Sequence, residues 1–410
     1  MDFSIDDELV SAGEALVKFI DREVVDLENK NTDVLYNERK LFDETGRFSP
    51  KVVELRKWVR MRSAELGFYT MFGDEELGGS GLGPLANIYI QELINHRYGP
   101  ERPLIQTYVI PSPFTNGLTP ILRWLSPALQ PSVLPMIASG EKTLCFGLSE
   151  PDAGSDVFSM RSRAVRDGDT WTITGTKQWI TNAPYADYAI IFAITNPELA
   201  NGRKRGITAF LVDTQATGFS VPSVIPIMGH LGAEIGIISL DGVRVTDAYR
   251  LGEVDEGLKV ALTGISAGRL SMAASCVGLA RWALDQAIEY SKIRKTFNKA
   301  IAEHQSIQNH LAECASDIYA AKTMVQHCAW LVLQKRPAIK ELSMVKSFAT
   351  EMLSRVMDRC IQVHGAMGLT NELRLEAGYR YARVLRIPDG TGEIQRRTIA
   401  RQLISGDTSI

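Results

Sequence analysis

The residues whose types and spacing point most clearly to chemistry lie between positions 145 and 183. The stretch opens as Cys-Phe-Gly-Leu-Ser-Glu-Pro-Asp-Ala-Gly-Ser-Asp-Val at Cys145 and closes as Lys-Gln-Trp-Ile-Thr-Asn over 177–182. A Gly168-Asp169 turn and an alternating run over 170–174 separate the two halves, which predicts a β-hairpin. Its loops would offer backbone N–H groups together with the side chains of Ser149, Ser155, Thr181 and Trp179. Such groups suit a planar, hydrogen-bonding ligand such as a flavin ring.

A second candidate for chemistry is the carboxyl group of Asp389, within Pro388-Asp389-Gly390. A positioned carboxylate can act as a general base that removes a proton from a substrate. The same tripeptide also favours a turn through its own backbone chemistry, with no catalytic role. Taken alone, the tripeptide leaves both interpretations open.

Composition limits the classes of protein that could carry these residues. With 410 residues, 45% of them hydrophobic, the chain can form a large core, and its length suggests two or three domains. A net charge of −3 lacks the excess of positive charge that is typical of a nucleic-acid-binding protein. Five scattered cysteines without CxxC spacing predict buried thiols in a reducing compartment and no metal site. An acidic N-terminus, and no apolar run near the roughly 18 residues of a membrane span, predict a soluble cytoplasmic protein.

The first third of the chain has a helical pattern. The spacing predicts helices over 52–66, ending at Gly67, and over 84–98, beginning at a proline and ending at Gly99. Between them lies Gly-Gly-Ser-Gly-Leu-Gly over 78–83. This is a weak dinucleotide fingerprint because no strand precedes it, so a loop between helices is preferred.

From about residue 144 to 251 the pattern becomes strand-like. The segments rich in Ile, Val, Phe and Thr are 185–195, 206–213, 219–227 and 235–245, and turn residues separate them. Short strands without helices between them favour an antiparallel sheet or a small barrel.

After Glu253 the helical period returns. Apolar residues stepping by four and three form a stripe made of Ile307, Leu311, Cys314, Ile318, Ala321, Val325, Cys328 and Val332. A further helix is predicted over about 338–363, and a segment rich in Ala, Gly and Ser over 261–287 permits close helix approach. The predicted fold class is therefore α+β: an N-terminal helical domain (1–142), a central antiparallel β domain (143–252) and a C-terminal four-helix bundle (253–410).

Several motifs in register resemble one family. Besides the two halves of 145–183, the chain has Arg-Lys-Thr-Phe-Asn-Lys at 294–299, Glu-His-Gln at 303–305, Gln-Val-His-Gly-Ala-Met-Gly at 362–368 and Asp-Gly-Thr-Gly-Glu-Ile-Gln-Arg at 389–396. Their order and spacing resemble the acyl-CoA dehydrogenase family over nearly the whole chain. The resemblance implies an FAD-dependent oxidoreductase of fatty acid metabolism that forms an α,β-double bond in an acyl-CoA.

The resemblance also implies cofactor-binding positions. In the β domain they are Phe146, Leu148, Ser149, Gly154, Ser155, Trp179 and Thr181, of which Ser155 also matches a position near the acyl-CoA. In the helical domain they are Arg294, Phe297, Gln305, Gln362, Gly365, Thr391 and Glu393. The arginine that matches Arg294 binds the FAD diphosphate from a neighbouring subunit, a role suited to a planar donor. Gly365-Ala366 stands where the family usually has paired glycines, and His364 is interpreted as a structural residue at a helix end.

For the mechanism, Asp389 matches the position where the family usually places a glutamate base. The base takes the α-proton while the flavin takes the β-hydrogen as hydride. Some members instead carry the glutamate directly before the arginine that matches Arg269, but here that residue is Gly268. Arg269 itself matches an arginine near the acyl-CoA, so Ser155, Arg269 and Asp389 are the substrate-binding residues implied.

Three functions are compatible with this resemblance. The preferred one is an acyl-CoA dehydrogenase that passes electrons to an electron-transferring flavoprotein and forms a homotetramer. A flavin oxidase of a small carbon acid, resembling nitroalkane oxidase, also uses aspartate at this position. The third is a non-catalytic flavoprotein that keeps the fold without turnover. The resemblance does not indicate the length, branching or ring content of the acyl group.

Overall fold

The computed structural model describes residues 5–112, 115–228 and 234–409. Contacts within the chain divide it into two compact units. Unit 1 comprises Met1–Lys18, Gly83–Arg102 and Gly268–Ile410, and unit 2 comprises Phe19–Leu82 and Pro103–Ala267. Each unit has its own hydrophobic core.

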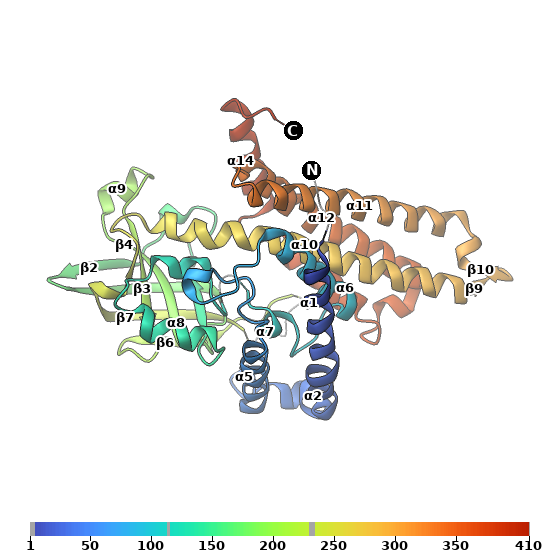
Figure 1. The fold of residues 1–410 in the computed structure, drawn as a ribbon, viewed down its shortest axis with the longest axis horizontal. Coiled ribbons are helices and arrows are strands. Elements are labelled where there is room, and N and C mark those ends of the chain that lie inside the picture. Colours follow the sequence, from blue (N-terminus) through green and yellow to red (C-terminus); the bar gives the residue numbers. More distant parts are fainter. Residues whose placement is uncertain (1–4, 113–114, 229–233, 410) are drawn as a thin grey trace. The chain divides into compact units, whose positions relative to one another are not determined.

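Unit 1 is helical (Figure 1). Its elements are α1 (Asp7–Phe19), α6 (Pro84–Tyr98), the larger part of α10 (Gly257–Ile293), the short strands β9 (Lys295–Thr296) and β10 (Lys299–Ala300), α11 (Gln305–Leu333), α12 (Ile339–His364), α13 (Leu375–Val384) and α14 (Gly392–Ile404). The predicted apolar stripe of α11 faces the core, where Cys314, Ile318, Ala321, Val325 and Cys328 are all buried. The helix predicted from apolar residues stepping by four and three is therefore confirmed.

Helices α6 and α10 approach each other closely at Gly278. A Cβ atom at this position would lie 2.5 Å from the carbonyl oxygen of Glu92 and 2.9 Å from the Cβ of Asn95. The small residues of 261–287 therefore do permit close helix approach, as predicted. At the edge of this contact, the Glu92 carboxylate pairs with Arg281 on α10 and with Lys322 on α11. The Lys322 ammonium lies 2.8 Å from it.

Helix α10 is also the one described helix that is long and apolar enough to cross a membrane by length and composition. Its 18-residue window has a mean hydropathy of 1.3, and half of that window is buried in the structure. Sequence analysis did not predict an apolar run of this length. Ala273, Cys276, Val277 and Ala280 of α10 belong to the core of unit 1, as in the core helix of a globular domain.

Unit 2 contains an eight-stranded sheet with helices (Figure 1). The strands are β1 (Leu144–Gly147), β2 (Arg163–Asp167), β3 (Thr170–Thr181), β4 (Tyr188–Ile194), β5 (Ile207–Asp213), β6 (Phe219–Val224), β7 (Ile235–Thr246) and β8 (Arg250–Leu251). Its α-helices include α2 (Val25–Lys30), α5 (Pro50–Glu65), α8 (Gln130–Ala138) and α9 (Pro197–Asn201), together with the short turns α3 (Thr32–Leu35), α4 (Glu38–Leu41) and α7 (Gln106–Val109). A π-helix spans Ile20–Val24 and a 3-10 helix spans Pro120–Trp124.

The sheet is mixed, whereas the sequence predicted an antiparallel one. The hairpin β2–β3 and the pairs β3–β7, β4–β5 and β6–β7 are antiparallel as expected, but β1 runs parallel to β4, and β2 makes one parallel bridge to β4. The cause is the long segment between β1 and β4. Because it holds the whole β2–β3 hairpin, the chain can return and enter β4 in the same direction as β1.

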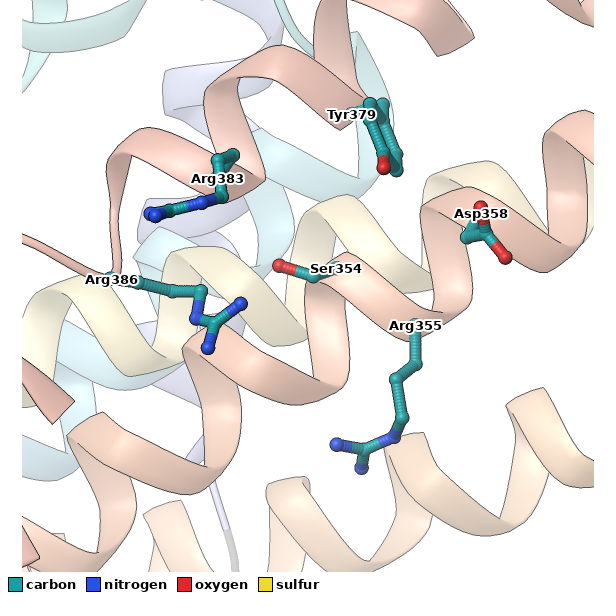
Figure 2. Close-up of a pocket in the computed structure, with 6 residues that line it drawn as sticks. All are labelled: Ser354, Arg355, Asp358, Tyr379, Arg383 and Arg386. Carbon is teal, nitrogen blue, oxygen red and sulfur yellow. The ribbon is translucent and has the colours of Figure 1, made fainter.

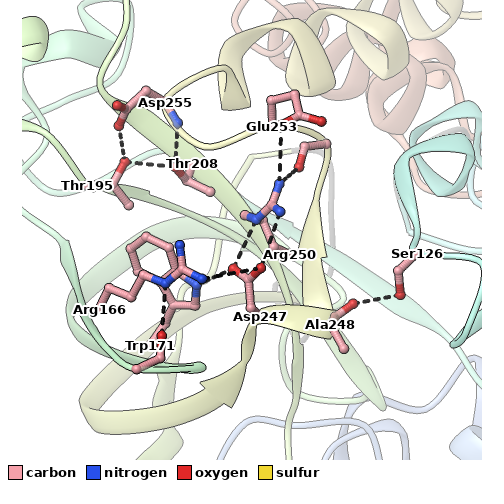
Figure 3. A network of polar contacts seen from close by, with 12 residues as sticks. Ser126, Arg166, Trp171, Thr195, Thr208, Asp247, Ala248, Arg250, Glu253 and Asp255 are labelled. Atoms are coloured by element: carbon pink, nitrogen blue, oxygen red, sulfur yellow. Dashed lines mark hydrogen bonds and ion pairs between the residues drawn. The ribbon is translucent and has the colours of Figure 1, made fainter.

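A network of polar contacts surrounds the end of strand β7 and the segment that follows it (Figure 3). The Asp247 carboxylate, directly after β7, accepts hydrogen bonds from the Trp171 indole at 2.7 Å and from Arg250 at 3.1 Å. Nearby, Thr195 contacts both Thr208, at 2.7 Å, and the Asp255 carboxylate. These bonds fix the turn after β7 and the segment that leads into α10.

Candidate active site

Asp389 lies in the tight turn that joins α13 to α14. Its φ is +57° and that of Gly390 is +90°, so two consecutive residues adopt left-handed backbone conformations. Such a conformation is unfavourable for a non-glycine residue and persists only where the surroundings hold it. Thr391 then caps α14, because its hydroxyl accepts a hydrogen bond from the N–H of Ile394 at 3.4 Å.

Three side chains from three helices hold the carbonyl oxygens of this turn. The Arg269 guanidinium on α10 donates to the Asp389 carbonyl at 3.0 Å. The Gln395 amide on α14 donates to the carbonyls of Asp389 and Gly390, both at 2.9 Å. Lys346 on α12 donates to the Gly390 carbonyl at 2.8 Å. The strained turn is therefore over-determined by its neighbours.

The carboxyl group of Asp389 itself is left unengaged. Within the described part of the chain it accepts no hydrogen bond and forms no ion pair, and the Asp389 backbone N–H also donates to no acceptor there. Burial raises the pKa of Asp389 to about 6, against the opposing charges of Lys346 and Arg269. A carboxylate with free oxygens and a raised pKa has the properties required of a general base near neutral pH.

In unit 2, the two halves of the 145–183 motif lie side by side. The N–H of Gln178 donates to the carbonyl oxygen of Ser149 at 3.0 Å. The buried ammonium of Lys177 donates to the carbonyl of Leu148 at 3.3 Å and to the Glu150 carboxylate at 2.6 Å. That carboxylate also accepts the N–H groups of Arg161 and Ser162. A buried ion pair thus fastens the loop after β1 to strand β3.

A bulge in strand β3 turns the Trp179 side chain outward. The register with β7 shifts between Lys177 and Ile180, and Trp179 has a φ of +66°. As a result the Trp179 side chain is 53% exposed, a large value for a tryptophan, and Thr181 is exposed as well.

These positions leave room for a bound flavin. Gly154 and Ser155 are exposed, a Cβ atom at Gly154 would meet nothing within 4 Å, and their N–H groups donate to no acceptor among the described residues. Phe146 and Leu148 are more enclosed, Phe146 packing against Phe192 with ring centroids 4.9 Å apart. The chemistry of the exposed donors and the indole therefore fits the predicted cofactor.

The remaining predicted positions lie in unit 1. Arg294, Phe297, Gln305, Gln362, Gly365 and Glu393 are all exposed. Phe297 is 92% exposed at the tip of the β9–β10 hairpin, with a φ of +49°. His364, in contrast, is buried, bonded to the carbonyl of Cys360 at 2.7 Å and stacked on Tyr290, which supports the structural role predicted for it.

A surface pocket of about 250 Å³ also occurs in unit 1 (Figure 2). It is lined by Ser354, Arg355, Asp358, Tyr379, Arg383 and Arg386. Arg355 is held by two hydrogen bonds to Asp317, at 3.0 and 3.1 Å, and Arg386 lies 3.9 Å from Glu351. None of the predicted site residues lines this pocket, so the chemistry favours the Asp389 turn as the active site.

Sequence reasoning missed the charged and polar residues that support both sites. Lys346, Lys177 and Gln395 are each 0% exposed and make their bonds to backbone carbonyls or to a buried carboxylate. A lysine within a helical or alternating pattern is normally interpreted as solvated. One signal was present for Lys346: it lies four residues after Leu342 and three before Ala349, both buried, so helical spacing places it on the apolar face of α12.

Two family models match the chain: the acyl-CoA dehydrogenase middle domain over residues 145–243 and the acyl-CoA dehydrogenase C-terminal domain over residues 255–404. A 3-(aryl)acrylate reductase of Clostridium sporogenes is 35% identical over 354 residues, covering 86% of this chain and 92% of that protein. The human mitochondrial short-chain specific acyl-CoA dehydrogenase is 36% identical over 341 residues, covering 83% and 80% respectively. The solved butyryl-CoA dehydrogenase of Megasphaera elsdenii superposes with a TM-score of 0.83 at 26% identity, covering 98% of this chain and 100% of that one.

Proposed function

Because the chain belongs to the acyl-CoA dehydrogenase family, an FAD-dependent family of oxidoreductases acting on CH–CH groups, we propose that it desaturates an acyl-CoA with Asp389 as the base. The observation that carries the proposal is the Asp389 carboxyl group, held on a strained turn with its oxygens unengaged and its pKa raised to about 6 by burial. When bound, FAD supplies the acceptor for the hydride that leaves the β-carbon.

The protein's own residues have three tasks in this reaction. The Asp389 carboxylate removes the α-proton and holds it on a carboxyl oxygen. Arg269 and Gln395 keep the turn in place through the Asp389 carbonyl, at 3.0 and 2.9 Å. The Asp389 N–H, which is free among the described residues, is available to polarise the thioester carbonyl and so to acidify the α-carbon.

The side chain of aspartate is shorter than that of the glutamate usual in the family. Proton transfer requires heavy atoms about 2.6–3.2 Å apart, or one bridging water. The proposal therefore requires the acyl α-carbon to lie closer to the α13–α14 turn than a glutamate base would need. This requirement restricts how the acyl group can enter and makes the substrate panel below informative.

The residues of unit 2 that would hold FAD are Gly154, Ser155, Thr181, Trp179, Phe146, Leu148 and Ser149, of which the first four are exposed. In unit 1 the proposed contacts are Arg294, Phe297, Gln305, Gln362, Gly365, Thr391 and Glu393. The exposure of Arg294 and Phe297 supports the proposal that they reach a second copy of the chain in a homotetramer. Light scattering tests this: a monomer that carries full FAD would contradict it.

Other parts of the proposal rest on the family match. An electron-transferring flavoprotein is the proposed electron acceptor, since a relative that is 34% identical to this chain is named as a subunit of a caffeyl-CoA reductase–Etf complex. The proposed domain limits are 1–142, 143–252 and 253–410, and the two matched ranges fall within the second and third of these. A cytoplasmic location and a role in fatty acid metabolism also belong to the proposal.

An anaerobic titration of the purified FAD protein with straight, branched and cyclic acyl-CoAs tests the function. Bleaching of the flavin absorbance by one class supports α,β-dehydrogenation and identifies the substrate class. The Asp389→Asn variant should keep FAD but lose turnover by several orders of magnitude, whereas wild-type rates would remove Asp389 from the mechanism. No bleaching by any acyl-CoA would favour the oxidase, tested with nitroalkanes, or a non-catalytic flavoprotein.

A second candidate is the reverse reaction, reduction of an enoyl-CoA, and the identity to a 3-(aryl)acrylate reductase favours it. The α,β-double bond is then consumed: the β-carbon receives hydride from the reduced flavin, and Asp389 delivers a proton to the α-carbon. Adding aryl-acrylyl-CoA to the dithionite-reduced protein separates the two directions. Rapid return of the oxidised flavin spectrum, together with slow bleaching by every saturated acyl-CoA, would identify a reductase.

A further inference from the structure

Lys346 is a fully buried cation that the proposed mechanism does not otherwise use. It lies on α12 and its side chain is 0% exposed. Burying an ammonium group away from water is costly unless it is paired or hydrogen-bonded. Among the described residues, the Lys346 ammonium donates one hydrogen bond, to the Gly390 carbonyl at 2.8 Å, so one of its three N–H donors is engaged.

That bond ends on the turn that carries Asp389. Gly390 follows Asp389 directly, and the same carbonyl also accepts from the Gln395 amide at 2.9 Å. Since Asp389 and Gly390 both have positive φ values, +57° and +90°, the turn has a conformation that depends on such contacts. Lys346 is thus one of the residues that determine where the Asp389 side chain points.

The charges around Lys346 come from three further elements. From α10 it faces Arg269 and the thiol of Cys276, from α14 it faces Glu393, and from the α13–α14 turn it faces Asp389. Burial holds the pKa of Lys346 at about 8, against the opposing attraction of Asp389. Asp389 in turn has no hydrogen-bond donor for its carboxylate among the described residues, so nearby positive charge is what favours its ionised form.

We propose that Lys346 is a positioning residue of the active site, which fixes the turn through the Gly390 carbonyl and supplies the buried positive charge that keeps Asp389 a carboxylate at neutral pH. The inference rests on the proposed function, because it assigns Lys346 a role through Asp389. Lys346 does not itself take the proton, and Arg269, the other cation near Asp389, acts in the same direction.

The test compares three variants of the full-length FAD enzyme. Lys346→Met removes both the charge and the hydrogen bond, Lys346→Gln removes the charge but keeps an N–H donor, and Lys346→Arg keeps the charge. The pH midpoint of kcat/KM should rise by about one pH unit in Lys346→Met and Lys346→Gln, so that kcat/KM near pH 6 falls about fivefold. In Lys346→Arg the midpoint should stay near that of the wild type.

A readout independent of turnover is the infrared band of the Asp389 carboxyl, identified by its absence in Asp389→Asn. Its titration should move to higher pH in Lys346→Gln. The matched control is Lys340→Met: Lys340 lies on the same helix and its side chain is also 0% exposed, but its ammonium bonds to the Asp407 carboxylate at 2.7 Å. This control should leave both midpoints unchanged.

The outcomes separate the inference from the proposed function. If Asp389→Asn abolishes turnover but Lys346→Gln and Lys346→Met titrate like the wild type, Lys346 is only structural and the inference is wrong, while the proposed function stands. If Asp389→Asn turns over normally, the proposed function fails first, and any effect at Lys346 must have another cause. A shifted infrared midpoint in a folded but inactive Lys346→Gln protein still supports the inference.

Discussion

Replacing Asp389 by asparagine should make the protein more stable at neutral pH while it abolishes turnover. Burial raises the pKa of Asp389 from 3.8 to about 6. Because the folded-state pKa lies above the unfolded-state one, this carboxyl contributes stability that is present below 3.8 and is lost as pH rises through about 6. The amide cannot ionise, so the Asp389→Asn variant does not lose this stability.

The size of the effect follows from the pKa difference. Each tenfold difference in proton affinity is worth about 1.4 kcal/mol, so the change from 3.8 to about 6 corresponds to about 3 kcal/mol. Asp389 is only partly buried, and solvent screening reduces this figure, so a gain of about 1–3 kcal/mol is expected near pH 7.5. Near pH 4.5 the gain should be smaller by about half or more. Little is lost in exchange, since the carboxyl accepts no hydrogen bond from the described residues.

Urea unfolding of the FAD protein, followed by tryptophan fluorescence at both pH values, measures this gain. Asp407→Asn provides a control with the opposite sign, because hydrogen bonding to Lys340 lowers the pKa of Asp407 and its charge stabilises the fold at neutral pH. The reasoning fails if Asp389→Asn is less stable than the wild type near pH 7.5, or if its gain is the same at both pH values.

Three further predictions concern other residues. Glu150→Gln leaves the Lys177 ammonium buried and unpaired and should cost about 3–5 kcal/mol in urea unfolding, part of which a Glu150→Gln, Lys177→Met double variant should recover. Gly278→Ala places a Cβ atom 2.5 Å from the Glu92 carbonyl and should lower the unfolding free energy by roughly 1–3 kcal/mol; an unchanged value would disprove the close contact. In stopped-flow experiments kcat/KM should rise with pH through about 6 as Asp389 ionises, and a flat profile would exclude it as the base.

The fold was largely predictable from local patterns. Helix α6 was predicted over 84–98 and is found at Pro84–Tyr98, because proline and glycine mark its two ends. Strand β7, predicted over 235–245, is found at Ile235–Thr246. The parallel pairing of β1 with β4 was not predictable from local patterns. It depends on where the chain returns after the β2–β3 hairpin, which lies between the two strands in sequence.

Only part of the candidate site could be predicted from the sequence. Asp389, Thr391 and Arg269 could be named from their motifs, and the structure brings Arg269 to the Asp389 carbonyl. Lys346 and Gln395 could not, since their importance lies in burial and in bonds to backbone oxygens distant in sequence. A sequence pattern identifies which residue types face inward, but it does not identify the acceptor that makes a buried cation tolerable.

All five cysteines, at positions 145, 276, 314, 328 and 360, are free and buried. The native protein should therefore react slowly with thiol reagents, and only when part of it opens. Cys145 lies in unit 2 and the other four in unit 1, so the labelling rate of each cysteine reports how often its own unit opens. Peptide mapping after timed labelling would thus give the two opening free energies separately, in one sample and without a mutation, with and without FAD or an acyl-CoA bound.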